Sequence, residues 1–384
     1  MEQKNMVPKR RFKEFQNTSA WEQRKLGKVV KTHQFRPYLA EPNAEGDFEV
    51  IQQGDRPVAG YTNGTPFENY RDVTLFGDHT VSLYKPTKPF FIATDGVKIL
   101  SADGLEGDFL FSLLERYKPE PQGYKRHFTI LKNQGAWITK NVEEQVKIGA
   151  FFKNLDHLIT LHQCKLEKMK TLKSAYLSEM FPAEGERVPK RRFAGFTQAW
   201  EQRKWEDTVD ISTNMVDPRT GLYDELPHIG PGNIESFTGK ILDNVLKVKD
   251  SNLISGKFHF YKGDIIYGKI NPQLGKYAIA PCEGLASADS YILNAKNGVV
   301  QNFLYSILQT KDFYKYSVSV SSRTGMPKIN RDELNVYNYK VPEIEEQKKI
   351  GSFFVGLDNL ITLHQRKLEK LQNIKKAYLN EMFV

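Results

Sequence analysis

The chain contains one long segment twice, and this duplication limits its possible folds more than any other feature. Residues 143–181 read EEQVKIGAFFKNLDHLITLHQCKLEKMKTLKSAYLSEMF, and residues 345–383 read EEQKKIGSFFVGLDNLITLHQRKLEKLQNIKKAYLNEMF. At an offset of 202, 27 of the 39 positions are identical. A second repeat, PKRRF followed by AWEQRK, precedes each copy. Two matching frames therefore enclose two unlike segments, 26–142 and 205–344, which indicates one scaffold applied to two different targets.

Each copy of the long segment has the heptad pattern of a coiled-coil helix. Apolar residues recur at steps of four and three, and neither copy contains proline. The pattern predicts helices over 143–181 and 345–384, each about 58 Å long at 1.5 Å per residue. Asn141 is the expected N-cap of the first helix, with Glu144 as its reciprocal partner. The predicted seam consists of Ile148, Phe152, Leu155, Ile159, His162, Leu166, Met169, Tyr176, Ile350, Phe354, Leu357, Ile361, His364, Leu368, Leu371 and Tyr378.

The order of the segments predicts that the two helices are antiparallel. The first helix leads from the first unlike segment to the second, and a pseudo-two-fold relation between the frames makes the second helix run back. The two chain termini are then expected to lie close together. His162 and His364 stand at the midpoints of the copies and would face each other. They are either a metal-binding or pH-sensitive pair or a polar position that fixes the register, and we favour the register.

The two unlike segments are each long enough for a domain and have the pattern of mixed α+β structure. Short apolar runs separated by Gly, Pro and Asp turns predict strands, and longer amphipathic stretches predict helices. The expected strands are 48–52, 80–84, 90–93, 265–267, 277–280 and 291–293, and the expected helices are 107–117 and 299–310. The predicted fold class is α+β: two globular domains separated by a pair of long antiparallel coiled-coil helices, as a pseudo-two-fold repeat.

Composition limits the class of protein. A length of 384 residues favours two domains. No apolar run is long enough to cross a bilayer, and the first residues lack the apolar core of a secretory signal. Only Cys164 and Cys282 occur, which favours a reducing cytoplasm and argues against disulfides or a cysteine zinc site. The net charge of +9 fits nucleic acid as a partner.

The sequence lacks the motifs of an independent enzyme. There is no GxxxxGK[ST] loop, HExxH helix, GxSxG elbow or kinase motif set. The run Asn271-Pro272-Gln273-Leu274 partly resembles the NPP-aromatic motif of adenine methyltransferases, but it lacks the second proline and the aromatic residue that would stack on a flipped base. We therefore expect no catalytic residue, no metal and no cofactor in this chain.

Polar and basic loops interleaved with aromatic residues are the candidates for DNA contacts. One is YGKINPQLGKY, between two predicted strands, and another is the hydroxyl-rich run SVSVSSRTGMPK at 317–328, expected to be a loop. Arg reads guanine and Asn or Gln reads adenine, while Lys, Ser and Thr hold phosphates. A solvated loop is the simpler interpretation of any single residue. The candidates are Lys269, Asn271, Gln273, Lys276, Ser321, Ser322, Arg323, Thr324 and Lys328 in the second segment, and Gln52, Gln53, His79, Thr80, Lys85, Lys98, Lys125 and Arg126 in the first.

The duplicated EEQ-x-KIG-x-FF…LD-x-LITLHQ-x-KLEK helix, the WEQRK entry and the phrases KGDIIYGKINP and GMPKIN resemble the specificity (S) subunit of type I restriction–modification systems. The first segment has no KINP-like phrase. The resemblance implies a first target recognition domain at 1–142, a first conserved spacer helix at 143–181, a linker and second target recognition domain at 182–344, and a second conserved spacer helix at 345–384.

The resemblance also implies how such a chain works. Each domain reads one part of a bipartite, asymmetric site on double-stranded DNA, while the helices dock two methyltransferase (M) subunits, and two restriction (R) subunits join through the complex. The chain is then the non-catalytic subunit of a type I site-specific deoxyribonuclease and adenine-N6 DNA methyltransferase, with S-adenosylmethionine, ATP and Mg²⁺ on its partners. The alternatives are an independent methyltransferase or nuclease, for which a cofactor or metal motif is missing, and a coiled-coil adaptor whose inserts bind proteins.

Overall fold

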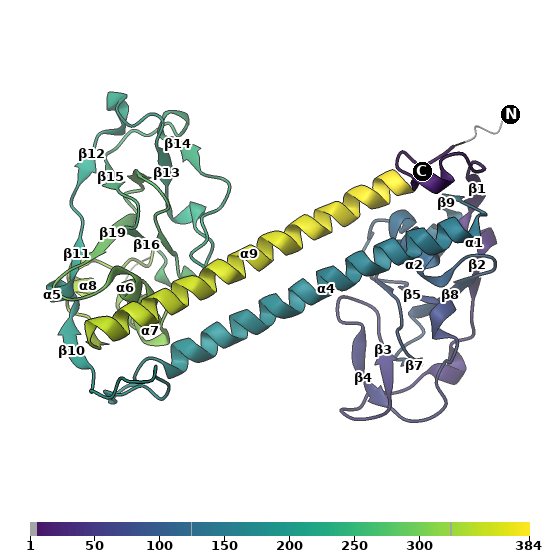
Figure 1. The fold of residues 1–384 in the computed structure, drawn as a ribbon, viewed down its shortest axis with the longest axis horizontal. Coiled ribbons are helices and arrows are strands. Elements are labelled where there is room, and N and C mark those ends of the chain that lie inside the picture. The colour runs from purple at the N-terminus through teal and green to yellow at the C-terminus, as the bar shows by residue number, and fades with distance from the viewer. Residues whose placement is uncertain (1–5, 124, 323–324) are drawn as a thin grey trace. The chain divides into compact units, whose positions relative to one another are not determined.

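The computed structural model describes residues 6–123, 125–322 and 325–384, and contacts divide the chain into two units (Figure 1). Unit 1 holds the residues up to Gln163 together with Lys367–Val384, and unit 2 holds Cys164–Arg366. Helix α4 (Val142–Glu179) begins in unit 1 and ends in unit 2, whereas α9 (Ile344–Met382) begins in unit 2 and ends in unit 1. Both predicted long helices are therefore confirmed.

Within each unit, the first turns of one long helix pack against the last turns of the other. In unit 1 the rings of Phe151 and Tyr378 have centroids 5.1 Å apart, and farther along α4 Asp156 pairs with Lys375 at 2.6 Å. The partner's number falls as the residue number rises, so the helix segments in this unit are antiparallel, as predicted. The corresponding pairs in unit 2 are Phe353–Tyr176 and Asp358–Lys173.

The strands of unit 1 form two sheets and one two-stranded ribbon (Figure 1). The first sheet has the order β2-β8-β5-β6, the second β4-β3-β7, and β1 pairs with β9. The strands are β1 (Glu22–Lys25), β2 (Val30–Thr32), β3 (Phe48–Ile51), β4 (Val58–Thr62), β5 (Thr74–Gly77), β6 (Leu83–Tyr84), β7 (Phe90–Ile92), β8 (Val97–Ala102) and β9 (Gly135–Ile138), and the shorter α-helices are α1 (Leu26–Val29), α2 (Gly107–Tyr117) and α3 (His127–Asn133).

Unit 2 repeats this plan and adds to it. Its four-stranded sheet has the order β11-β19-β16-β17, β10 pairs with β20, and the second sheet is β12-β15-β18-β13-β14. The strands are β10 (Glu201–Lys204), β11 (Val209–Ile211), β12 (Met215–Val216), β13 (Pro227–Ile229), β14 (Leu246–Lys247), β15 (Lys257–Phe260), β16 (Ile265–Gly268), β17 (Tyr277–Ile279), β18 (Gly284–Ala286), β19 (Ser290–Ala295) and β20 (Asn338–Val341), and the shorter helices are α5 (Trp205–Thr208), α6 (Gln301–Ile307), α7 (Lys311–Ser321) and α8 (Arg331–Asn335).

The two unlike segments thus share a topology that their sequences do not display. The antiparallel pairs of β5 with β8 and β6 match those of β16 with β19 and β17. The parallel pair of β3 and β7 matches that of β13 and β18. Unit 2 extends its second sheet by β15 and β12. The paired strands β5 and β8 can therefore be aligned residue by residue with β16 and β19.

Two of the expected elements are wrong in part. The strand expected at 80–84 is confirmed only at Leu83–Tyr84, because Thr80 lies in the tight turn that joins β5 to β6. The loop expected at 317–328 begins as the last turns of helix α7, whose serines donate hydrogen bonds back to carbonyl groups three or four residues earlier. The other expected strands and helices of the two segments are present.

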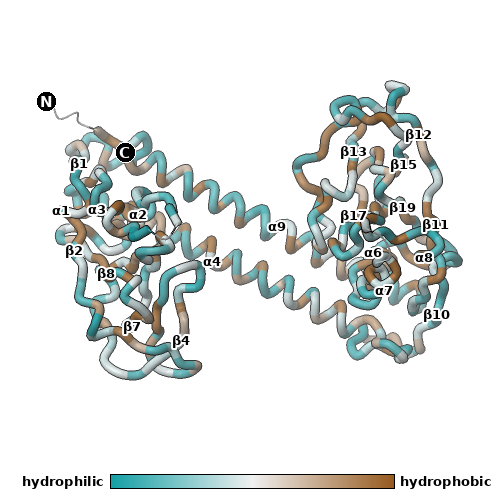
Figure 2. The backbone as a smooth tube through the Cα atoms, turned by 180° about the vertical axis from the view of Figure 1, so that it is seen from behind, coloured by the Kyte–Doolittle hydropathy of each residue, from teal (hydrophilic) through white to brown (hydrophobic). Residues whose placement is uncertain are grey.

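Each unit has a core rich in aromatic rings, to which both long helices contribute. Figure 2 shows hydrophobic residues, in brown, along the strands and helices of each unit. In unit 1 the ring of Phe383, just after α9, packs against three others. Its centroid lies 5.7 Å from those of Trp21 and Phe109 and 6.0 Å from that of Phe152. Trp21 and Phe383 therefore share one core, and the Arg10 N–H donates to the Glu381 carbonyl, so described residues near the two termini lie close together, as expected. The corresponding rings of unit 2 are Phe181, Trp200, Phe303 and Phe354.

The duplicated EEQ…IG motif anchors the start of each long helix to its own unit. In α4 the buried Gln145 donates to the Thr139 and Gly104 carbonyl groups and accepts from the Glu106 N–H. A Cβ on Gly149 would lie 2.7 Å from the backbone nitrogen of Phe109 in α2, so only glycine lets α4 and α2 come this close. In α9, Gln347 and Gly351 make the same contacts with Pro342, Gly298, Val300 and α6.

Two arginines of each PKRRF motif hold the ends of the long helices. In unit 1, Arg11 binds the fully buried carboxylate of Glu144, and Arg10 binds Glu381. Asn141 accepts from the Glu144 N–H at 3.0 Å, so the predicted N-cap is confirmed. The predicted reciprocal bond is wrong, because the Glu144 carboxylate is taken by Arg11 and Thr139. In unit 2 the ion pairs are Arg192–Glu346 and Arg191–Glu179.

Candidate nucleic-acid interface

In each unit, four segments meet beside the glycine that ends a central strand, and most of the predicted DNA contacts lie on them. We call these places the unit 1 junction and the unit 2 junction. The unit 1 junction consists of 52–54 after β3, 78–81 between β5 and β6, 94–96 before β8, and 125–127 before α3. The unit 2 junction consists of 230–233 after β13, 269–275 between β16 and β17, 287–289 before β19, and 327–329 before α8.

Backbone hydrogen bonds hold both junctions in the same way. In unit 1 the Asp78 N–H donates to the Gly96 carbonyl at 2.8 Å, and the His127 N–H donates to the Asp78 carbonyl at 2.9 Å. In unit 2 the corresponding bonds run from Lys269 to Asp289 at 2.9 Å and from Ile329 to Lys269 at 3.0 Å. Residue 78 therefore corresponds to 269, 98 to 291, and 126 to 328.

The unit 1 junction brings together an amide, an imidazole and a hydroxyl. The side-chain oxygen of Gln53 accepts from the His79 N–H at 3.0 Å, and the Gln53 side chain lies over Gly77 and Gly96. His79 and Thr80 are exposed, and the Thr80 hydroxyl bonds that of Ser82 at 2.8 Å. Gln52 is exposed beside them and donates to the Arg56 carbonyl. This arrangement presents donors and acceptors of the kind that read adenine.

A buried acid neutralises a lysine in the unit 1 junction. One Asp78 oxygen accepts from the Phe128 N–H at 2.8 Å, in the first turn of α3, and the other lies 4.0 Å from the Lys98 ammonium. Lys98 also donates to the Asp95 carbonyl at 2.6 Å. Lys125 and Arg126 are exposed at the edge of the junction. Basic charge is thus available at the edge, whereas Lys98 is held by anionic and carbonyl oxygens.

The unit 2 junction is basic at the corresponding place. Lys269 lies with its ammonium 5.1 Å from the centre of the Tyr291 ring. Burial lowers the pKa of Lys269, and the charge of Lys328 lowers it further. In unit 1 the Asp78 side chain accepts a hydrogen bond from the first turn of α3. In unit 2 the corresponding helix α8 is capped by its own residues Asn330 and Glu333, so it makes no such use of Lys269. The backbone of Lys328 is bridged to that of Ile270, so adjacent segments carry the two lysines of this junction.

The rest of the 269–275 loop is held rigidly. Asn271 has a left-handed backbone (φ +47°), and its N–H donates to the Pro327 carbonyl at 2.7 Å. Gln273 is exposed and its amide lies 3.3 Å from the Asn271 side-chain oxygen. Lys276, by contrast, donates to the Ile234 carbonyl at 2.5 Å, which directs it into the protein. Asn271 and Gln273 thus remain candidates, and Lys276 has a structural contact.

Several predicted contacts lie away from the junctions. Lys85 donates to the Arg71 and Val73 carbonyl groups at 2.6 and 3.1 Å, and burial lowers its pKa, so it supports the fold. Ser321 is buried and bonds within α7, and the Ser322 hydroxyl also bonds within that helix. Their hydroxyls are occupied by helix carbonyls instead of being presented from a loop. Arg323 and Thr324 lie outside the described residues.

All residues of the predicted seam are buried or half-buried. The fully buried ones include Ile148 and Phe152 in unit 1 and Ile350 and Phe354 in unit 2. These four pack into the aromatic cores of their units, so the start of each helix serves the globular domain as well as the helix pair. His162 and His364 are half-buried and belong to different units, and their pairing stays a prediction.

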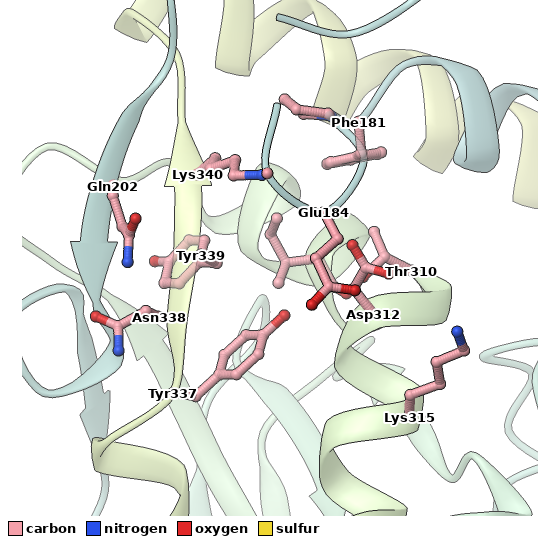
Figure 3. Close-up of a pocket in the computed structure, with 13 residues that line it drawn as sticks. Phe181, Glu184, Gln202, Thr310, Asp312, Lys315, Tyr337, Asn338, Tyr339 and Lys340 are labelled. Carbon is pink, nitrogen blue, oxygen red and sulfur yellow. The ribbon is translucent and has the colours of Figure 1, made fainter. Parts of the chain in front are cut away.

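Unit 2 also has a cavity of about 390 Å³ outside its junction (Figure 3). It lies between the segment that follows α4, strand β20 and the start of α7, and Glu184, Asp312, Lys315 and Tyr337 are among its lining residues. Burial raises the pKa of Tyr337. None of the predicted DNA contacts lines this cavity.

The described residues contain no group of three or more His, Cys, Asp or Glu side chains placed to hold a metal ion. In those same ranges no helix combines the length and the apolar character needed to cross a membrane. Residues 230–233, Asp289 and Tyr291 also belong to the unit 2 junction or contact it, but they were not among the predicted DNA contacts. Asp289 stands just before the predicted strand 291–293, which was the available signal for it, whereas strand β13 before residues 230–233 was not predicted.

Known proteins are similar to this chain in sequence and in fold. Residues 198–373 match the model of the type I restriction modification DNA specificity domain. The specificity subunit of the type I restriction enzyme EcoDI from Escherichia coli is 29% identical over 210 residues, which are 53% of this chain and 46% of that protein. The MjaVIII specificity subunit from Methanocaldococcus jannaschii is 23% identical over 257 residues, 62% of this chain and 59% of its own length. The chain spans about half the length of the curated relatives it matches.

Among solved structures, the S subunit of a type I restriction–modification system from M. genitalium matches with a TM-score of 0.70. The alignment covers 99% of this chain and 99% of that chain at 14% sequence identity. At this identity the match shows a common fold.

Proposed function

We propose that this chain, whose sequence and fold are similar to those of type I restriction–modification specificity subunits, recognises DNA sequence and performs no catalysis itself. One observation carries the proposal: two junctions with the same backbone bonds hold different polar and basic side chains, Gln53 and His79 in one unit and Lys269 and Lys328 in the other. A common frame with unlike contacts suits the reading of two unlike sequences.

The proposed target is bipartite and asymmetric. Each unit reads a few base pairs of double-stranded DNA, and because the junctions differ the two parts of the site differ. Helices α4 and α9 set the length of the non-specific gap between them. Seven residues inserted into each helix lengthen it by about 10 Å, or roughly three base pairs of DNA. We expect such a variant to select the same two sequences with a longer gap, and an unchanged gap would contradict the spacer role.

The proposed protein partners are two methyltransferase (M) subunits, and through them two restriction (R) subunits. Exposed leucines support a duplicated docking surface: Leu158 and Leu161 on α4 are 43% and 39% exposed, and Leu360 and Leu363 on α9 are 49% and 46% exposed. The same residue types at the same places of both repeats fit two copies of one partner. S-adenosylmethionine, ATP and Mg²⁺ would be bound by those partners, and the complex would work in the cytoplasm.

The test is DNA selection by the chain copurified with its methyltransferase subunits. From random duplexes we expect two short unlike sequences at a fixed gap, bound with an affinity that falls steeply as salt rises. Adenines within these sequences should become methylated in cells that carry an intact copy of the gene and stay unmethylated without it. Binding without sequence preference would favour the adaptor alternative, and methyl transfer by the isolated chain would favour an independent enzyme.

A further inference from the structure

The two junctions differ most at one pair of corresponding positions. Residue 78 is an acid that is 4% exposed, and residue 269 is a half-buried lysine, yet both donate and accept the same two backbone hydrogen bonds. The charge at this place is therefore inverted while the backbone is kept. Such an inversion alters what the site attracts without altering the fold.

The surroundings explain how each charge is tolerated. Asp78 accepts the Phe128 N–H at 2.8 Å and faces Lys98 at 4.0 Å. At the corresponding places unit 2 has Asn330, which caps its own helix, and Tyr291, whose ring lies 5.1 Å from the Lys269 ammonium. Asp78 is thus used within the protein, whereas Lys269 rests on an aromatic ring.

The charges around Lys269 are mostly positive. The charges of Lys328 and Arg331 lower the pKa of Lys269, and only the charge of the exposed Asp289 raises it. The Arg331 guanidinium donates to the Ile211 and Ser212 carbonyl groups. The backbone of Lys328 is bridged to that of Ile270, so adjacent segments carry the two lysines, and an acceptor-rich ligand bound by both would relieve the repulsion between them.

We propose that positions 269 and 78 make the two half-sites differ: Lys269 directly reads a guanine edge with Lys328, and Asp78 is a positioning residue that keeps Lys98 from the DNA. Guanine presents two acceptors, O6 and N7, in the major groove, and lysine is one of the side chains that read them. With Lys98 withheld, the unit 1 junction reads through Gln53 and His79. This inference rests on the proposed DNA recognition and names the residues that make the two units read different bases.

The experiment is selection from random duplexes by the complex with methyltransferase subunits, carrying one substitution at a time. Lys269→Gln is expected to lose preference for a G·C pair at one position of one half-site, by roughly 5- to 140-fold, which corresponds to one bidentate base contact. Lys269→Arg is expected to keep that preference because arginine makes the same contact. The matched control is Lys262→Gln, an exposed lysine of unit 2 outside the junction, expected to select as the wild type does.

Asp78→Asn keeps an oxygen for the Phe128 N–H and removes the charge that holds Lys98. We expect it to steepen the salt dependence of binding by about one phosphate contact, a change of roughly 0.9 in the slope of log K against log salt. Any change of selected sequence must fall in the half-site that Lys269→Gln leaves intact. Thermal unfolding and circular dichroism check that each variant is folded.

Three results would overturn the inference: an unchanged base preference in Lys269→Gln, an unchanged salt slope in Asp78→Asn, or effects of both variants on the same half-site. Failure of the wild-type complex to select any sequence refutes the proposed function itself, so the two failures are distinguishable.

Discussion

The buried pair of Arg192 and Glu346 provides a stringent test of what holds the long helices to their units. The guanidinium donates to both carboxylate oxygens, at 2.6 and 2.7 Å, and the Glu346 side chain is fully buried. Replacing Arg192 by alanine leaves this carboxylate buried without its partner. Breaking a buried pair in this way costs about 3–5 kcal/mol.

The neighbouring arginine is a matched control. Arg191 also binds a glutamate at 2.6 Å, but the Arg191 and Glu179 side chains are 55% and 39% exposed. Solvent screening limits such a pair to roughly 0–1 kcal/mol. Arg192→Ala and Arg191→Ala remove the same chemical group at neighbouring positions. A difference in their effects on stability therefore reports the burial of the ion pair.

We expect Arg192→Ala to lower the unfolding midpoint of unit 2 by about 10 °C, since roughly 1 kcal/mol moves a domain of this size by 2–4 °C. Arg191→Ala should lower it by no more than about 4 °C. Hydrogen exchange should show lost protection in the first turns of α9 for Arg192→Ala alone. Replacing Arg192 and Glu346 together by methionine and leucine should recover most of the loss, because no uncompensated charge remains. Equal effects of the two alanine variants would refute the reasoning.

Four further variants test packing and charge in the same unit. Gly351→Ala places a Cβ 2.7 Å from the backbone of α6 and should destabilise unit 2 by about 2 kcal/mol or more in chemical unfolding. The Cβ of Gly356→Ala meets nothing within 4 Å, so this variant should stabilise α9 by up to about 1 kcal/mol. Burial raises the pKa of Asp358 despite its partner Lys173, so replacing both by leucine should leave the unfolding free energy at pH 7 unchanged or higher, and a loss above about 2 kcal/mol would contradict this. Burial and the charge of Lys257 lower the pKa of His228, so the unfolded chain binds a proton at this residue more readily than the folded protein does. The free energy of unfolding should therefore fall as the pH drops below about 6.5, and unfolding measured at several pH values should show a smaller fall for His228→Gln.

The sequence predicted the scaffold well because its signals are local or repeated. The heptad pattern predicted both long helices, and chain order predicted their antiparallel packing and the meeting of the termini in unit 1. The resemblance to type I specificity subunits is confirmed by the matching domain model and by the fold. The serines of 317–321 were assigned to a loop because hydroxyl-rich runs favour loops, yet their hydroxyls bond helix carbonyls and Phe313 and Ser317 bury one face of α7.

The common topology of the two units could not be predicted from the sequence. The correspondence of Asp78 with Lys269 depends on hydrogen bonds between backbone groups, which leave no mark on residue type. Lys85 and Lys276 were named as DNA contacts because they are basic and lie near turns, but both donate to backbone carbonyl groups of their own unit. Only long-range packing decides whether a loop lysine points to solvent or into the protein.

The long helices are held by side-chain hydrogen bonds and the junctions by backbone hydrogen bonds, and this difference explains which parts of the chain are duplicated. The starts of the long helices are held by side chains, such as Gln145 and Gln347, whose loss would leave buried polar groups without partners. These positions need the same residue in both copies. The junctions are held by backbone groups, so residues 78 and 269 can differ in charge while the loop stays in place. Recognition can therefore change at the junctions at little cost to stability, while the frame that supports them stays the same.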